Sequence, residues 1–180
     1  RLRQMSLLAR FYLREQALWK RLRGFGEAAH TGAWLGLLSP RALHAVDQAF
    51  YARSRTYLGD AHNLKGLLPW EEKAVREFFP AGGRRVLIGA GGGREVLALA
   101  RMGYAVDGVE CNPALVAYGN ELLAREGVDA RLAVVPRDRA PGSGGPYDGA
   151  IVGWGAYMLM MGRPRRVGFL RGLRALLPEG

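Results

Sequence analysis

Residues 86–95, Val-Leu-Ile-Gly-Ala-Gly-Gly-Gly-Arg-Glu, decide the fold of this 180-residue chain. Three apolar residues predict a short buried strand, and a loop with four glycines follows it before a helix begins at Arg94. Glycine permits a tight turn and lets a ligand lie against bare backbone. The N-terminus of the following helix directs unpaired N–H groups at that ligand. The stretch therefore predicts a strand–loop–helix turn that binds a ligand.

A second strand, expected over 105–109, ends at an acidic residue. Glu110 stands there, 21 residues beyond Gly89, and the pair Asn112-Pro113 after it is typical of a helix start. A carboxylate at the tip of this strand can accept hydrogen bonds from both hydroxyls of an adenosine ribose. The alternative is an ordinary solvated residue at a strand end. The predicted contacts of the adenosine ligand are Gly89, Ala90, Gly91, Gly93, Glu110, Cys111 and Asn112.

Strands and helices alternate through the second half of the chain. This alternation is typical of βαβ units, which build a parallel sheet flanked by helices. We therefore predict an α/β, Rossmann-like fold with a mainly parallel sheet. The expected strands cover 85–88, 105–109, 130–135 and 147–152, and the expected helices cover 94–102, 113–126 and 165–177.

The first part of the chain has helical periodicity instead. We expect helices over 1–30, 40–53 and 69–79, with Ser39 as the N-cap of the second helix and Gly24 and Gly26 interrupting the first. The predicted division is a helical lid or substrate-binding region at 1–68, followed by a nucleoside-binding domain at 69–180.

The glycine spacing distinguishes between adenosine cofactors. Dinucleotide-binding folds favour Gly-x-Gly-x-x-Gly, but position 94, where the third glycine would fall, is arginine. The spacing Gly-x-Gly-x-Gly resembles the first motif of class I S-adenosylmethionine (SAM)-dependent methyltransferases. Residues 146–152, PYDGAIV, and 169–180, FLRGLRALLPEG, resemble later segments of the same family. The resemblance covers about residues 70–180 and implies that SAM is the cofactor.

The resemblance also implies further site residues. Asp138 is the nearest match to an acid that lies near the adenine, and His62 lies in a segment that closes over SAM in this family, where it is a candidate general base. Trp154 and Tyr157 follow the fourth strand and line a pocket in one interpretation, or the core in the other. Leu87 stands where the family usually has an acid. Glu95 is either its substitute or an ordinary acid in the first turn of the helix.

Two other functions are compatible with these patterns. Arg94 at a helix start could hold a phosphate of NAD(P) in an oxidoreductase. The net charge of +10, dense near the N-terminus, could serve a non-catalytic protein that binds nucleic acid. We favour a methyltransferase with a small-molecule acceptor, because the glycine spacing argues against the first alternative and no nucleic-acid-binding motif accompanies the charge.

Composition limits the remaining expectations. One cysteine and three scattered histidines predict no metal site. Cys111 alone cannot form an intramolecular disulfide, which favours a cytoplasmic protein. The longest stretch without charge, 149–162, is too short to span a bilayer, so we expect no membrane partner. Family members have seven strands and this chain has four expected strands, so we expect the remaining C-terminal strands to be missing. The sequence does not determine the oligomeric state.

Overall fold

The computed structural model describes residues 6–178, apart from the side chain of Trp154. It contains two compact units, Arg1–Asp47 and Gln48–Gly180. This division falls earlier than the predicted boundary between residues 68 and 69. The reason is that the segment after Asp47 packs on the α/β part: helix α3 (Asp60–Asn63) contacts helix α5 (Arg94–Arg101).

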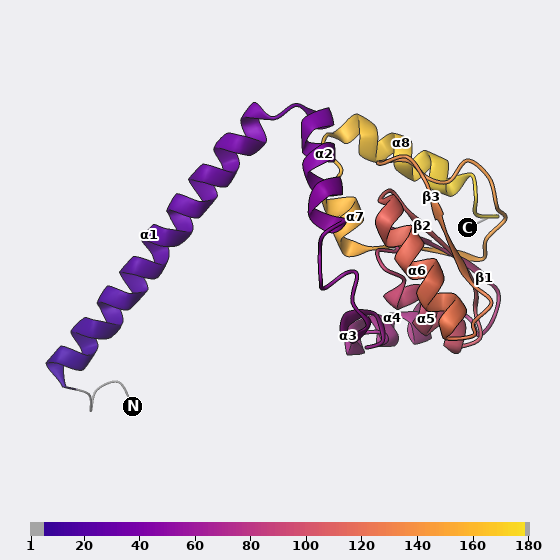
Figure 1. Cartoon of the computed structure of the whole chain (residues 1–180), viewed down its shortest axis with the longest axis horizontal. Coiled ribbons are helices and arrows are strands. Elements are labelled where there is room, and N and C mark those ends of the chain that lie inside the picture. The colour runs from indigo at the N-terminus through magenta and orange to yellow at the C-terminus, as the bar shows by residue number, and fades with distance from the viewer. Residues whose placement is uncertain (1–5, 179–180) are drawn as a thin grey trace. The chain divides into compact units, whose positions relative to one another are not determined.

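Four parallel strands form the sheet of the second unit, in the order β3-β2-β1-β4. Ile88 at the end of β1 is in register with Val109 of β2 on one side and with Val152 of β4 on the other. The carboxyl ends of these three strands therefore meet at one edge (Figure 1). The predicted α/β sheet is confirmed, and its strands are β1 (Arg84–Ile88), β2 (Ala105–Glu110), β3 (Arg131–Val134) and β4 (Gly149–Val152).

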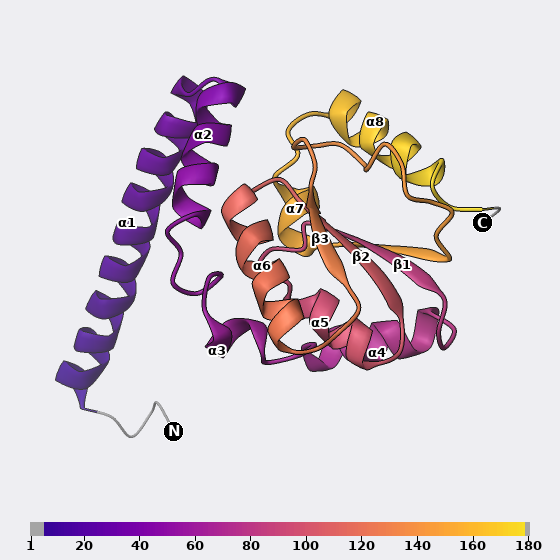
Figure 2. The ribbon, with the colours of Figure 1, turned by 45° about the vertical axis from the view of Figure 1, so that its right-hand side comes forward.

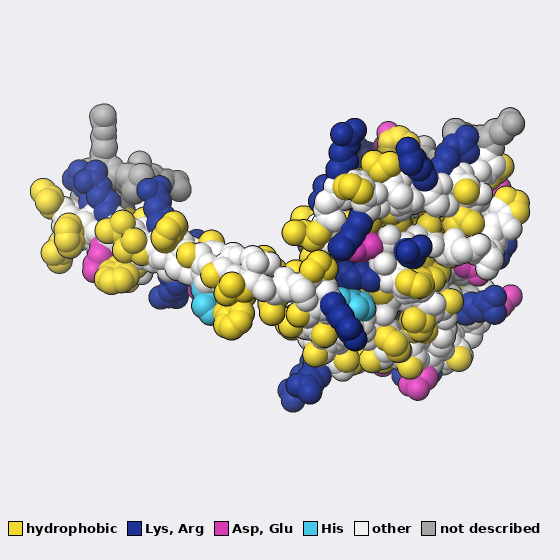
Figure 3. Space-filling model, turned by 90° about the horizontal axis from the view of Figure 1, so that it is seen from above, with side chains coloured by type: hydrophobic (Ala, Val, Ile, Leu, Met, Phe, Trp, Pro, Cys, Tyr) yellow, Lys and Arg dark blue, Asp and Glu magenta, His cyan; other side chains and the backbone are white. Residues whose placement is uncertain are grey.

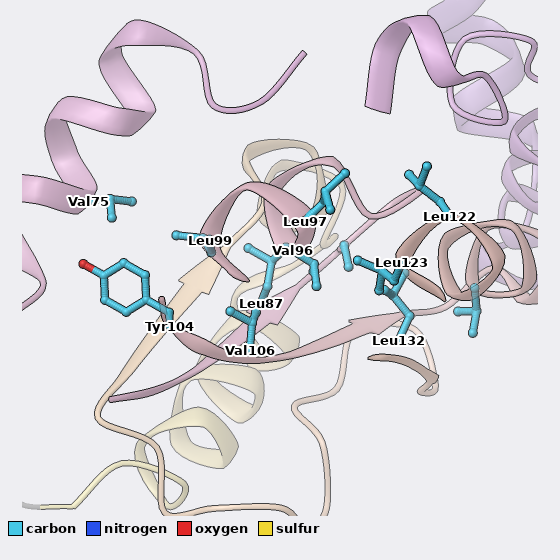
Figure 4. Close-up of a cluster of buried hydrophobic side chains, with 12 residues drawn as sticks. Val75, Leu87, Val96, Leu97, Leu99, Tyr104, Val106, Leu122, Leu123 and Leu132 are labelled. Carbon is cyan, nitrogen blue, oxygen red and sulfur yellow. The ribbon is translucent and has the colours of Figure 1, made fainter. Parts of the chain in front are cut away.

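Helices cover both faces of this sheet (Figure 2). Helices α4 (Pro69–Phe78), α5 and α6 (Pro113–Arg125) lie on one face, and α8 (Arg163–Arg174) lies on the other. Strand β1 serves both cores, because Leu87 points into the first and its neighbours Val86 and Ile88 point into the second. Figure 4 shows the first cluster, which is Val75, Leu87, Ala90, Val96, Leu97, Leu99, Tyr104, Val106, Val116, Leu122, Leu123 and Leu132.

Several predicted helix boundaries are confirmed. The hydroxyl of Ser39 accepts a hydrogen bond from the N–H of Ala42, and the amide oxygen of Asn112 accepts one from Ala114. Gly103 follows the end of α5 with a φ of 87°. Two short helices were not predicted. They are α3 in the expected loop before residue 69 and α7 (Trp154–Met158) after β4.

The first unit holds a long helix. Helix α1 (Leu7–Leu37) runs without interruption through Gly24 and Gly26, so the prediction that these glycines interrupt it is wrong. No residue of α1 is buried, within the part of the chain that is described. Helix α2 (Pro40–Tyr51) follows it. No helix among the described residues is both long and apolar enough to cross a membrane.

A buried ion pair joins α4 to α5. The guanidinium of Arg94 donates to both carboxylate oxygens of Glu71, at 2.7 Å each, and to the carbonyl oxygen of Gly66 at 2.8 Å. It also pairs with the carboxylate of Glu95. The side chain of Arg94 is only 7% exposed and that of Glu71 only 11%. Removing one partner of such a pair leaves the other charge buried without compensation.

We expect Arg94→Met to lower the free energy of unfolding by about 3 kcal/mol, because two carboxylates lose their counter-charge in a poorly solvated place. Arg76→Met is the matched control. Arg76 pairs with Glu72 on the same helix but is 67% exposed, so its loss should cost no more than about 0.5 kcal/mol. Urea denaturation of both variants measures the difference. Equal losses would contradict the structural role of Arg94.

Candidate functional site

The glycine loop connects β1 to α5 and is attached to the neighbouring strand. The N–H groups of Gly89 and Ala90 donate to the carbonyl oxygen of Val109, at 2.8 and 3.0 Å. Gly89, Gly91 and Gly93 have φ values of 75°, 54° and 98°, which L-residues rarely adopt. The loop therefore presents its backbone at the carboxyl edge of the sheet, where open α/β sheets bind ligands.

Glu110 turns its carboxylate onto this loop. Its Oε2 accepts a hydrogen bond from the N–H of Gly91 at 3.0 Å, and its Oε1 accepts from the N–H groups of Cys111 at 2.7 Å and Asn112 at 3.0 Å. Three backbone donors thus fix one carboxylate between the end of β2 and the glycine loop. The structure brings the predicted residues Gly91 and Glu110 into direct contact.

The other two residues predicted at this turn, Cys111 and Asn112, both form hydrogen bonds with Gln48. The side chain of Asn112 caps α6 and donates to the carbonyl oxygen of Gln48 at 3.1 Å, so it is occupied within the protein. The amide of Gln48 donates in return to the carbonyl oxygen of Cys111 at 2.8 Å. Burial, together with the nearby charge of Glu110, raises the pKa of the Cys111 thiol to about 12. At neutral pH, Cys111 is therefore a neutral thiol.

A tyrosine from the segment before α3 covers the glycine loop. A Cβ at Gly92 would overlap the carbonyl oxygen of Tyr57, and a Cβ at Gly91 would lie 3.9 Å from the Tyr57 ring. Asn63, which is 1% exposed, holds Tyr57 in place by donating to its carbonyl oxygen at 3.0 Å. Gly92 is the one glycine of this loop without a positive φ. A glycine is needed at position 92 because any side chain there would collide with Tyr57. The glycine itself is the only sign of this contact in the sequence.

Aromatic rings continue from Tyr57 in two directions. The rings of Tyr51 and His62 both meet it edge to face, at centroid distances of 5.2 and 5.3 Å. Partial burial, followed by the nearby positive charges of Arg94 and Lys65, lowers the pKa of His62 below 6.5. His62 is therefore mostly neutral at pH 7 and able to accept a proton.

Two residues predicted after the third and fourth strands, Asp138 and Tyr157, contact side chains outside the glycine loop. Asp138 has a φ of 61° and lies between Arg137 and Arg165, with N–O distances of 3.7 and 3.8 Å. Tyr157 packs toward α8, with its ring 6.4 Å from that of Phe169. The prediction for the side chain of Trp154 lies outside the described residues.

Another residue of α7 meets the glycine loop instead. A Cβ at Gly89 would lie 2.5 Å from the Cβ of Ala156. Helix α7 therefore lies against the start of the loop. Glu95, the predicted substitute for the missing family acid, pairs with Arg94, and burial raises the pKa of its carboxyl. Leu87, at the position of that acid, is buried in the core.

Comparison with solved structures identifies the fold. A protein studied in the conversion of a disulfide bond into a thioacetal group during echinomycin biosynthesis matches at 21% identity with a TM-score of 0.61, over 76% of this chain and 56% of that chain. The glycopeptide N-methyltransferase MtfA, solved with SAM, matches at 17% identity and a TM-score of 0.53, over 59% and 48%. A SAM-dependent methyltransferase from Clostridium acetobutylicum matches at 12% identity and 0.53, over 76% and 52%.

These matches confirm the Rossmann-like fold of class I SAM-dependent methyltransferases that the sequence predicted. The identities are low, so the likeness is one of fold. The chain spans about half the length of the solved structures that it matches. No protein-family model matches this sequence, and no curated protein matches it significantly.

We expect Gly89→Ala to destabilise the protein more than Gly103→Ala. Both residues have a positive φ, but a Cβ at Gly103 meets open space, whereas one at Gly89 overlaps Ala156. The control should lose about 1 kcal/mol from backbone strain alone, and Gly89→Ala should lose about 1–3 kcal/mol more from overpacking. Thermal unfolding measures both. The added substitution Ala156→Gly should recover part of the second loss. If it recovers none, α7 does not lie against Gly89.

The pKa of His62 can be followed by NMR titration of its ring protons. We expect a midpoint below 6.5, and a shift upward in Lys65→Gln, because that change removes one of the positive charges that lower it. Lys73→Gln on α4 is the control and should leave the midpoint unchanged. Since the folded-state pKa is lowered, the unfolded state binds the proton more readily, and stability should fall as the pH drops below 6.5. A midpoint above 6.5 would contradict this environment.

Proposed function

We propose that this chain binds SAM at the glycine loop and belongs to a methyltransferase that acts on a small molecule. The observation that carries the proposal is the carboxylate of Glu110 held against Gly91 by hydrogen bonds. An acid at the end of β2, facing bare backbone at the end of β1, suits a nucleoside whose ribose lies across the two strands. SAM when bound supplies a methyl group activated by a sulfonium.

The residues present fit the sugar of such a nucleoside. A carboxylate has about four acceptor positions, and three backbone N–H groups already donate to Glu110. It can still accept one ribose hydroxyl, and exchanging the hydrogen bond from Gly91 allows a second. The backbone donors keep the carboxylate oriented in the absence of ligand, so little ordering is required on binding.

The surroundings of the loop assign roles to other residues. Tyr57 lies against Gly91 and Gly92 and shields that part of the loop from water. The neutral thiol of Cys111 does not compete with the acceptor as a nucleophile. His62, neutral at pH 7 and in contact with Tyr57, is the candidate general base for an acceptor that must lose a proton.

The NAD(P)-dependent alternative is disfavoured by Arg94. That alternative needs its guanidinium for a phosphate, but the group is buried and hydrogen-bonded to Glu71, Glu95 and Gly66. A small-molecule acceptor is supported by the fold neighbours, one of which is a glycopeptide N-methyltransferase.

Isothermal titration calorimetry with SAM tests the proposal. We expect micromolar binding of SAM and of S-adenosylhomocysteine, and none of NADH or NADPH. Glu110→Gln should weaken SAM binding by at least roughly tenfold, since hydrogen bonds to a charged group contribute about 1.5–3 kcal/mol each. Glu121→Gln on the exposed surface of α6 is the matched control and should bind like the wild type.

Folding and binding must be measured separately, because Glu110 also accepts hydrogen bonds from its own turn. The melting temperature of each variant without ligand reports on folding, and the rise in melting temperature with SAM reports on binding. A folded Glu110→Gln variant that keeps the full rise would place the ribose elsewhere. Wild-type protein that melts normally but ignores SAM would refute the proposal.

A further inference from the structure

Helix α1 has an apolar face that its own unit leaves uncovered. Residues at steps of three, four and seven project from one side of the helix. In Figure 3, hydrophobic side chains are exposed along this helix. Each member of this face is more than half exposed. The face consists of Leu7, Leu8, Phe11, Tyr12, Leu18, Trp19, Leu22 and Phe25, and the acid on the same side, Glu15, accepts a hydrogen bond from the indole of Trp19.

An exposed apolar stripe of eight side chains indicates that this face binds a partner. Side chains of tyrosine, tryptophan, phenylalanine and leucine in one continuous stripe mark an interaction surface on a water-soluble protein. Crossing a bilayer is not the explanation, because no described helix is apolar enough for it. The stripe occupies one side of the helix between Leu7 and Phe25, where Leu13 is the large apolar residue outside it. Further along the helix, Trp34, Leu35 and Leu37 are also exposed.

The other side of the helix is positively charged. Five basic residues, Arg10, Arg14, Lys20, Arg21 and Arg23, lie beside the apolar face or opposite it, and Glu27 is the acid among them. The whole unit of residues 1–47 has eight basic and three acidic side chains, for a net charge of +5. The helix therefore combines an apolar stripe with a cationic flank.

Charge argues against a partner within this protein. Residues 48–180 have 18 basic and 13 acidic side chains, which is again a net charge of +5. A second copy of the helix and the α/β unit itself would both meet α1 with like charge. The complementary partner is anionic. A nucleic acid would satisfy the arginines but leave the leucine, phenylalanine and tryptophan stripe in water.

We propose that α1 is an interfacial helix that docks on an anionic lipid surface. The apolar stripe inserts at the boundary between headgroups and acyl chains, while the arginines and lysine remain at the level of the anionic headgroups. Trp19 and Tyr12 belong to the residue types that favour this boundary. This role is additional to the proposed SAM binding, and it differs from the expectation that the protein has no membrane partner.

Flotation of the full chain with lipid vesicles tests the proposal. We expect binding to vesicles of equal parts phosphatidylcholine and phosphatidylglycerol, and much weaker binding to phosphatidylcholine alone. Leu22→Gln should weaken binding to the anionic vesicles roughly tenfold, because one leucine no longer leaves water. Leu13→Gln is the matched control: it makes the same change on the same helix, but on the polar side, and should bind like the wild type.

Charge and oligomeric state complete the test. Arg14→Glu with Arg21→Glu should abolish the preference for anionic vesicles, and raising the salt should weaken wild-type binding. Leucine and glutamine have similar helix propensities, so circular dichroism should report unchanged helix content in both glutamine variants. Three results would overturn the proposal: equal effects of Leu13→Gln and Leu22→Gln, no preference for anionic lipid, or a dimer that Leu22→Gln dissociates while vesicle binding is absent.

Discussion

The site depends on one carboxylate that the backbone holds in place. Glu110 ends β2, and its two oxygens accept N–H groups from its own turn and from the glycine loop after β1. This contact exists because β1 and β2 are parallel neighbours, so that their carboxyl ends meet at the same edge. The glycines allow Tyr57 and Ala156 to approach the loop closely, and Glu110 places a carboxylate beside it. The other contacts of the site are arranged around this pair.

The fold could be predicted where its signal is local. Short, largely apolar runs in 85–88 and 105–109 mark strands, and capping residues such as Ser39 and Asn112 mark helix starts. Both signals follow from short stretches of chain. Helices α3 and α7 have only four and five residues. A helix of one turn has no measurable period, so its existence depends on tertiary packing, such as the contact of Ala156 with Gly89. Nothing in the sequence around residue 156 predicts the contact between Ala156 and Gly89.

In the candidate site, too, the local contacts could be predicted and the contacts with distant segments could not. The glycine loop and Glu110 were identifiable because strand, loop, helix and acid follow one another within a single βαβ unit. Gln48 meets Cys111 from 63 residues away, and Tyr57 covers a loop more than 30 residues beyond it. Arg94 shows how a partner from a distant segment changes the interpretation of a local signal. As a helix-start arginine it suggested a phosphate ligand, but its partner Glu71 lies on a separate helix and takes up its charge within the protein.

Helix α1 shows what an amphipathic pattern does and does not specify. The spacing of Phe11, Leu18 and Leu22 predicted a helix, and the helix is present. Periodicity states that these side chains share a face, but not what that face contacts. In a protein core the covering surface comes from the same chain, and the pattern alone would suggest that here. Here the unit that holds α1 leaves the whole stripe exposed, and the charge of the same sign on both units is the reason for proposing an anionic partner outside the protein. The same hydrophobic effect that closes the α/β core thus directs α1 to a partner.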